Sequence, residues 1–270
     1  MSLISSKYAA TLSEHSHRPF ALQNGAWIMN QSWCNLLFAH WPVDIEQLRQ
    51  LVPPQLELDL YEGIAYIGVV PFEMREVSPR YTPSLPWLSY FPELNVRIYV
   101  RHKGRQGVFF FSLDAGNPLA VWIARRFYHL PYYNATMLCR HEKSTYHYSS
   151  TRKKRNRLSE IDIRASGYED QNCELDVTYA PAGPVYYSVP GSLEHFLTER
   201  YCLFTVYREQ VFCGHIHHKA WPLQKAEAEW RHNSMTATLG LKLDGEPLLH
   251  YVENIDTVEW PIRKQDFHAI

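Results

Sequence analysis

The stretch that decides the fold is Leu94-Asn-Val-Arg-Ile-Tyr-Val-Arg101, in which aliphatic and more polar side chains alternate without a break. Successive side chains of a β-strand point to opposite faces of the sheet. The four aliphatic residues therefore share one face, and Asn95, Arg97, Tyr99 and Arg101 share the other. This alternation predicts a strand with one face in a hydrophobic core.

The segment that follows is apolar on both faces, which is typical of a central strand. Val108–Leu113 comes directly after a glycine-flanked turn at Lys103–Gly107, so the two strands are expected to form a hairpin. Another turn at Glu62–Gly63 predicts a second hairpin. The remaining strand-like segments are Leu56–Leu60, Ile64–Val77, Tyr146–Ser150, Leu158–Ala165, Cys173–Tyr179, Leu203–Tyr207, Val211–His217, Met235–Leu243 and Leu248–Trp260.

Three short helices are predicted by capping residues, which are Asp44, Asn117 and Ser192. They cover Val43–Leu51, Pro118–Phe127 and Leu193–Tyr201. Many strands with few helices, and neither a repeat nor a linker, predict an α+β, mostly β protein. We expect a closed or strongly curved antiparallel β-barrel-like sheet in a single domain over residues 1–270, with an N-terminal arm of about residues 1–30.

The composition is that of an ordinary globular protein. Hydrophobic residues make up 46% and charged residues 20%, and the net charge of −1 gives no global field that would attract nucleic acid. Five scattered cysteines without a CxxC pair argue against a disulfide framework and a zinc ribbon. No signal-peptide core and no membrane-length apolar run are visible, so a cytoplasmic protein is expected.

One strand carries side chains of the metal-ligand type. Cys213, His215 and His217 are spaced by two and would share a strand face. No partner pair is recognisable elsewhere in the sequence, and His218 with Lys219 indicates a solvated strand end. The expectation is therefore no bound metal, and no cofactor is indicated.

A basic run, Arg152–Arg157, places five cations in six residues between two strand-like segments. Such a run could contact phosphates, but the neutral balance of the chain favours solvated charges at a hairpin tip. A nucleic-acid or protein adaptor would rest on this run alone. Gly-rich phosphate loops, GxSxG, HExxH and paired CxxC motifs do not occur, which excludes several enzyme classes.

Several segments together carry a resemblance to a known family. They are Leu51–Leu56, Tyr90–Arg97, Val108–Ala115, Ala124–Ala135 and Leu193–Tyr201. In these, the chain resembles the YqjF-like family of uncharacterised bacterial proteins over about residues 33–260. That family in turn resembles acetoacetate decarboxylase, which implies a closed β-barrel-like fold around a hydrophobic cavity.

The resemblance also indicates what is missing. In the decarboxylase, the helix after the central strand leads to an aromatic residue, a proline and two adjacent lysines, the first of which forms a Schiff base. The matching positions are Leu130, Pro131, Tyr132 and Tyr133, so both lysines are absent. Schiff-base chemistry is not expected, because it needs an amine with a lowered pKa in an apolar pocket.

Glu93 matches, by its place after Phe91-Pro92, the glutamate that faces the decarboxylase cavity. Glu93, Asn95 and Arg97 share one strand face, which would supply a proton-transfer carboxyl and an anion clamp if that face lines a cavity. The alternative is a solvent face with an ordinary surface ion pair. Arg125 and Arg126, on the helix, are further candidates.

Two functional hypotheses follow. In the first, the protein binds a small carbonyl or carboxylate compound, with Glu93, Asn95, Arg97, Tyr132 and Tyr133 as ligand-binding residues. In the second, a lyase- or isomerase-type enzyme uses Glu93 and Tyr132 for proton transfer. Either way the expected partner is a small molecule, with neither nucleic acid nor a membrane, and homo-oligomer formation is left open.

Overall fold

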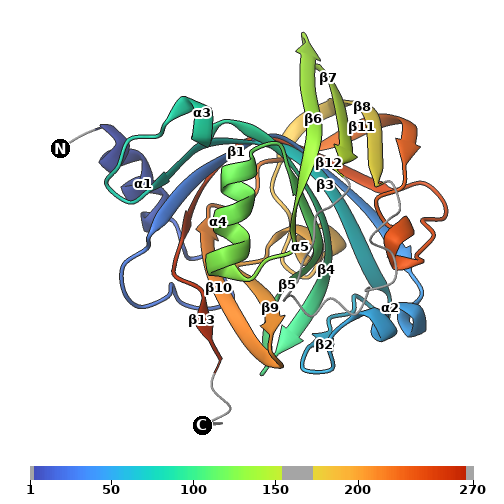
Figure 1. The fold of residues 1–270 in the computed structure, drawn as a ribbon, viewed down its shortest axis with the longest axis horizontal. Helices are drawn as coiled ribbons and strands as arrows, with labels where there is room; N and C mark the ends of the chain where they lie inside the picture. The colour runs from blue at the N-terminus through green and yellow to red at the C-terminus, as the bar shows by residue number, and fades with distance from the viewer. Residues whose placement is uncertain (1–2, 154–172, 266–270) are drawn as a thin grey trace.

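The computed structural model describes residues 3–153 and 173–265. Its strands join one 13-stranded sheet (Figure 1). The strands are β1 Met29–Val43, β2 Glu57–Leu58, β3 Ala65–Pro79, β4 Phe91–His102, β5 Arg105–Ala115, β6 Tyr132–Glu142, β7 Thr145–Arg152, β8 Glu174–Tyr186, β9 Cys202–Tyr207, β10 Gln210–His218, β11 Leu223–Asn233, β12 Leu248–Glu259 and β13 Arg263–Lys264. The helices are α1 Leu3–Ser13, α2 Ile45–Leu51, α3 Pro86–Ser89, α4 Pro118–Tyr128 and α5 Leu193–Thr198, with a 3₁₀ turn at Ala237–Leu239.

Hydrogen bonds close this sheet into a ring, as the sequence pattern predicted. Strand β5 pairs with β4, β6 and β9, and β12 pairs with β1, β10 and β11. One closed path runs through β6, β7, β8 and β11, and another runs through β9 and β10. The two paths share a wall formed by β12, β1, β3, β4 and β5. The pairings of β5 with β6 and β9 are parallel, so the sheet is mixed where an antiparallel one was expected.

The shared wall separates two interiors, and β4 shows why. Its residues Leu94, Val96 and Ile98 are buried in the largest hydrophobic cluster, together with Tyr148 of β7. The intervening residues face the other side of the wall. Strand β5 is likewise apolar on both faces, which confirms that it is a central strand. The alternating pattern of β4 therefore places its aliphatic residues in the hydrophobic core on one side of the wall. The intervening residues face a second interior on the other side.

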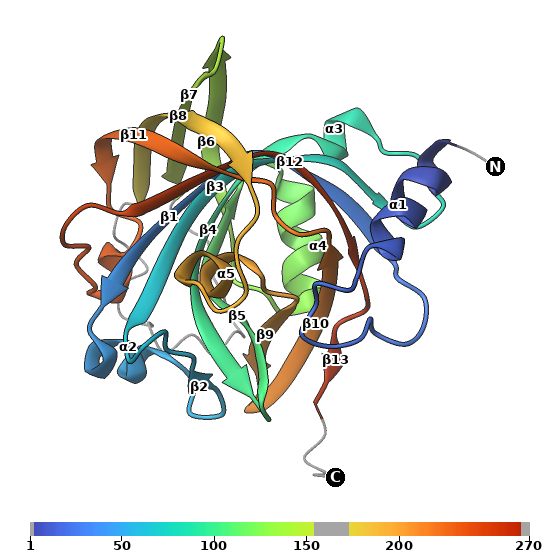
Figure 2. The same ribbon diagram turned by 180° about the vertical axis from the view of Figure 1, so that it is seen from behind.

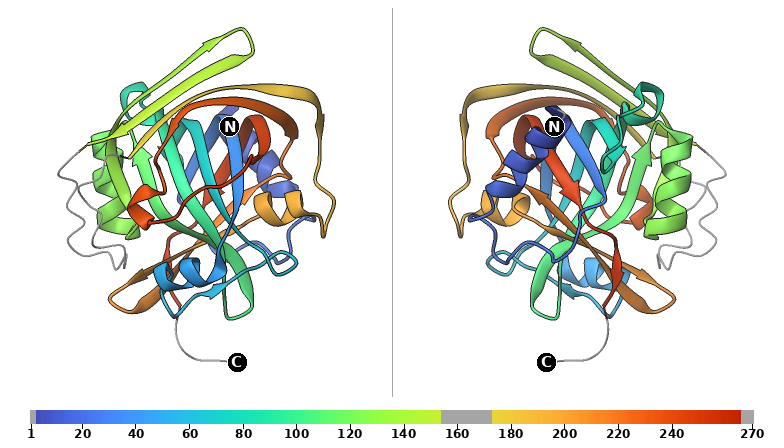
Figure 3. Two further views of the ribbon diagram at one scale, coloured as in Figure 1. Left: turned by 90° about the vertical axis from the view of Figure 1, so that its right-hand side faces the viewer. Right: turned by 90° about the vertical axis from the view of Figure 1, so that its left-hand side faces the viewer.

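Two helices lie at opposite ends of this second interior. Figure 1 shows α4 in front of the ring, and in Figure 2, seen from behind, α5 is on the near side. The side views in Figure 3 place the two helices at opposite edges of the molecule. Side chains from α4 and residues just after α5 line the space between them. The helices thus delimit the interior along the view axis of Figure 1.

The predicted helices are present, with shifted ends. The Asp44 carboxylate accepts a hydrogen bond from the backbone N–H of Gln47 at 2.8 Å, so α2 begins one residue after its cap. The amide oxygen of Asn117 accepts from two N–H groups of α4. Helix α5 ends at Thr198 and not at Tyr201, because Glu199 leaves the helical region and the chain turns into β9. Within the described ranges, no helix is long and apolar enough to cross a membrane.

Three local predictions are wrong. The turn at Glu62–Gly63 forms, but β2 pairs with β4 and not with β3. Met235–Leu243 is not a strand, since it holds the 3₁₀ turn and Gly240 at φ 67°. Arg152 is not a solvated hairpin residue. Its guanidinium binds the buried Asp114 carboxylate at 2.7 Å, and removing that charge from water requires such a partner. Residues 154–157 of the basic run and the predicted strand 158–165 lie outside the described residues.

Candidate functional site

The second interior contains a cavity of about 480 Å³, within the range of small-molecule pockets. Its walls come from the shared sheet, β9, β10 and α4. Aromatic and aliphatic side chains dominate the lining, for example Trp33, Phe72, Phe110, Leu113 and Trp221. The few polar groups in it therefore determine what kind of ligand could be held there.

Glu93 is the acid on the β4 wall of this cavity, and its side chain is 1% exposed. Burial, which disfavours the charged carboxylate, raises the pKa of Glu93 to about 8. A hydrogen bond from the Tyr132 hydroxyl, at 3.1 Å, opposes this rise because it stabilises the carboxylate. The Glu93 carboxyl is therefore mostly protonated at neutral pH.

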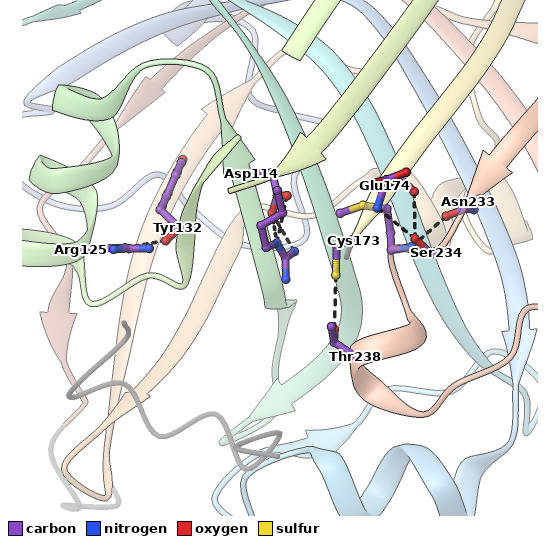
Figure 4. Close-up of polar contacts among 10 residues, drawn as sticks. Asp114, Arg125, Tyr132, Cys173, Glu174, Asn233, Ser234 and Thr238 are labelled. Carbon is purple, nitrogen blue, oxygen red and sulfur yellow. Dashed lines mark hydrogen bonds and ion pairs between the residues drawn. The ribbon is translucent and has the colours of Figure 1, made fainter. Parts of the chain in front are cut away.

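Tyr132 faces Glu93 from the first residue of β6. Tyr132 lies outside the strands predicted from the sequence, but it pairs with Leu113 of β5 in a parallel register. Figure 4 shows the Arg125 guanidinium on the Tyr132 main chain, where Nε donates to the carbonyl oxygen at 2.5 Å. Burial and the Glu93 carboxyl raise the pKa of Tyr132 well above its usual value. Its hydroxyl is thus a fixed hydrogen-bond donor.

Arg97 supplies a buried positive charge on the same face of β4. Its Nη2 donates to the Leu197 carbonyl oxygen at 3.0 Å, and its guanidinium lies 5.0 Å from the Phe38 ring centroid. Its Nε is buried without a hydrogen-bond partner. Among the described residues, no carboxylate forms an ion pair with Arg97. Arg200, which also lines the cavity, differs because it binds the Asp59 carboxylate at 2.5 Å.

A second acid, Glu259 of β12, also lines the cavity and was not anticipated from the sequence. Desolvation raises the pKa of Glu259 to about 7. Its charge acts on Glu93 and Tyr132, whose pKa values it raises further. The signal that could have identified it is a charged residue at the end of the predicted strand Leu248–Trp260, where Val258 and Trp260 on either side of it are buried.

The other predicted ligand-binding residues separate into two groups. Asn95 lines the cavity, and its Oδ1 is buried without a hydrogen-bond partner. Tyr133 is not among the lining residues, because its ring packs against Arg152 with the guanidinium carbon 3.9 Å from the ring centroid. The helix candidates have different positions: Arg125 binds the Tyr132 carbonyl, while Arg126 lies against the exposed ring of Phe127.

The predicted row Cys213, His215 and His217 is split by the fold. The Nδ1 atom of His217 accepts a hydrogen bond from the Arg18 guanidinium, and its Nε2 atom donates one to the Thr11 carbonyl oxygen. Cys213 and His215 instead lie beside Cys202 of the neighbouring strand β9. In residues 3–153 and 173–265, these three form the one group of three or more metal-type donors.

Comparison with known sequences finds a matching family and a relative. The model of the DUF2071 family, described as an uncharacterized conserved protein, matches residues 30–256. The uncharacterized protein YqjF of Bacillus subtilis (strain 168) is 42% identical over 245 residues, covering 90% of this chain and 95% of that protein.

Solved structures of low sequence identity share the fold. Acetoacetate decarboxylase from Legionella pneumophila has a TM-score of 0.57 at 14% identity and covers 94% of both chains. The enduracididine biosynthesis enzyme MppR, complexed with a condensation product of pyruvate and imidazole 4-carboxaldehyde, has a TM-score of 0.59 at 9% identity, covering 91% of this chain and 92% of that one. The expected decarboxylase-like fold is confirmed.

Proposed function

This chain belongs to the DUF2071 family, and we propose that it binds a small carboxylate or carbonyl compound in its cavity, without Schiff-base chemistry. The observation that carries the proposal is the buried Arg97 guanidinium, which lines an apolar cavity without a carboxylate partner among the described residues. An arginine side chain stays charged in proteins, and burying an unpaired charge is costly. A ligand with an anionic end would compensate this charge.

The acids of the cavity cancel that charge only in part at neutral pH. Glu93, with a pKa of about 8, is mostly neutral, and Glu259, with a pKa of about 7, is partly so. The protonated Glu93 carboxyl can also donate a hydrogen bond to a carbonyl or carboxylate oxygen. Arg97 and Glu93 would then hold the polar end of the ligand, and the aromatic walls would cover its apolar part.

The lack of a lysine amine in the described cavity lining argues against an imine between the protein and a carbonyl ligand. No lysine occurs among the described residues that line the cavity. A structural neighbour, MppR, has been seen complexed with pyruvate, a small keto acid. We transfer from it only the class of ligand, since at 10% identity the likeness shows a shared fold alone.

The test is a titration of the purified protein with pyruvate, acetoacetate and hexanoate by calorimetry, each against the Arg97→Leu variant. Saturable binding of one of these carboxylates by the wild type, and its loss in the variant, would support the proposal. Equal binding by both proteins would contradict the role of Arg97.

A second candidate function is proton transfer by a lyase- or isomerase-type enzyme. It is favoured by Glu93, whose pKa of about 8 lies close to the operating pH that an acid or base catalyst needs. Tyr132 would orient the Glu93 carboxyl through its 3.1 Å hydrogen bond and would not ionise itself. Exchange of ligand C–H protons with D₂O, followed by NMR and lost in Glu93→Gln, would identify this activity.

A further inference from the structure

We propose that Cys202, Cys213 and His215 form a binding site for a soft divalent cation, Zn²⁺, on the β9–β10 pair. The three side chains are 1%, 1% and 6% exposed, and their donor atoms all lie within 4.8 Å of one another. Strand pairing explains the group, because His215 is the cross-strand partner of Cys202 and Cys213 lies two residues away on the same face.

The spacing of the donors fits a tetrahedral metal. Cys202 Sγ is 3.7 Å from Nδ1 of His215, and Cys213 Sγ is 3.7 Å from Nε2. A zinc ion with Zn–S of about 2.3 Å and Zn–N of about 2.0 Å holds sulfur and nitrogen about 3.5 Å apart at the tetrahedral angle. A small ring rotation would direct one nitrogen to an ion between the two sulfurs.

The partners of His215 differ from those of nearby histidines. His217 and His218 each place a ring nitrogen against a backbone carbonyl oxygen. The nitrogens of His215 contact two sulfurs and one Arg105 nitrogen, at 3.2 and 3.5 Å, and no oxygen. Its imidazole therefore lies against two sulfurs, which are soft donors of the kind that zinc prefers, beside the Arg105 guanidinium.

Solvent access to His215 and the charges around the group both allow Zn²⁺ to bind. His215 also lines an open pocket of about 290 Å³, which gives a path from solvent and room for a water as fourth ligand. Two thiolates neutralise the charge of Zn²⁺, so the cations that share this pocket, Lys103, Arg105 and Arg263, do not oppose binding strongly. The residues of β10 alone predicted no metal, whereas β9 adds Cys202 beside Cys213 and His215.

The test is the metal content of reduced, tag-free protein purified without chelator, followed by titration with Zn²⁺ and Co²⁺. We expect about one zinc per chain by elemental analysis. The Co²⁺ form should show thiolate-to-cobalt charge-transfer absorption, which requires cysteine ligands and can be measured on the wild type. Loss of one ligand in Cys202→Ala should weaken Zn²⁺ binding by more than the about 10–100-fold that loss of an outer-shell partner costs.

The matched control is Cys173→Ala, which removes another buried thiol far from the group along the chain. It should keep wild-type metal affinity. The inference is overturned if the wild type takes up neither ion stoichiometrically, if bound Co²⁺ shows no charge transfer, or if Cys202→Ala binds as tightly as the control. Circular dichroism of both variants separates a lost site from a lost fold.

Discussion

The hydroxyl of Tyr132 donates a hydrogen bond to Oε2 of Glu93 at 3.1 Å, across the cavity wall between β6 and β4. These residues are 39 positions apart in the chain. The bond stabilises the charged form of a carboxyl that burial otherwise keeps neutral, so it adjusts the protonation of Glu93 within the physiological range.

Replacing Tyr132 by Phe is therefore expected to raise the pKa of Glu93 above about 8, because the variant loses the donor that lowers it. The pKa can be measured from the carboxyl carbon chemical shift of Glu93 in ¹³C-labelled protein. Tyr133→Phe is the matched control, since Tyr133 lies outside the cavity lining. An unchanged or lower pKa in Tyr132→Phe would show that the bond does not form in solution.

The stability of the protein should depend on Glu93 in a defined pH window. Its folded pKa of about 8 is raised above the ordinary value of 4.5, so the folded state binds more protons than the unfolded state between these values. Stability from this group is thus present below about pH 4.5 and is lost as pH rises toward 8, by up to about 1.4 kcal/mol per pH unit.

Glu93→Gln removes this loss while keeping an oxygen for the Tyr132 hydroxyl. Urea unfolding at pH 5 and pH 8 should show a smaller fall in the free energy of unfolding for Glu93→Gln than for the wild type. Glu57→Gln, at an exposed position of β2, should behave as the wild type does. An equal fall in the free energy of unfolding from pH 5 to pH 8 in all three proteins would be inconsistent with a neutral buried Glu93.

Arg97→Leu should weaken binding of a carboxylate ligand by at least about tenfold, the scale of a lost charge-assisted contact. The change is measured by calorimetry with whichever of pyruvate, acetoacetate and hexanoate binds the wild type. Arg231→Leu, which removes an exposed cation outside the cavity, should leave the affinity unaltered. A similar loss in both variants would point to general electrostatics and away from a specific clamp.

Affinity for an anionic ligand should also fall as pH rises from about 6 to 9. Glu259 and then Glu93 become charged in this range, with pKa values of about 7 and 8. Each new negative charge in the cavity costs on the order of 1–2 kcal/mol at an effective dielectric constant of about 20, which is about tenfold in affinity. A neutral ligand of the same shape should show a much smaller pH dependence in the same titration.

Sodium borohydride in the presence of acetoacetate should leave the mass of the protein unchanged. Reduction traps only an imine, and an imine needs a lysine amine that the described part of the cavity lining does not contain. Intact-mass spectrometry provides the measurement, with an acetoacetate decarboxylase as the positive control. A reduced adduct that maps to one lysine would require a different chemistry from the one proposed.

The sequence by itself determined the elements that local chemistry controls. Alternation in Leu94–Arg101 was sufficient to place Leu94, Val96 and Ile98 on one face, because the period of a strand is fixed by backbone geometry. The caps Asp44 and Asn117 were recognisable because a side-chain oxygen bonds an N–H two or three residues away. A curved, mostly β fold followed from many such short-range patterns.

The tertiary structure decided which residues that are distant in the chain lie next to each other. Glu259 meets Glu93 in one cavity, and Cys202 meets His215, because β12 and β9 take their places in a ring of hydrogen bonds between residues far apart in the chain. Likewise, Arg152 of β7 became a buried partner of Asp114 of β5 only because both strands pair with β6. Such pairings depend on the registry of the closed sheet, and protonation depends on the burial that closure creates, so neither can be inferred from residue order alone.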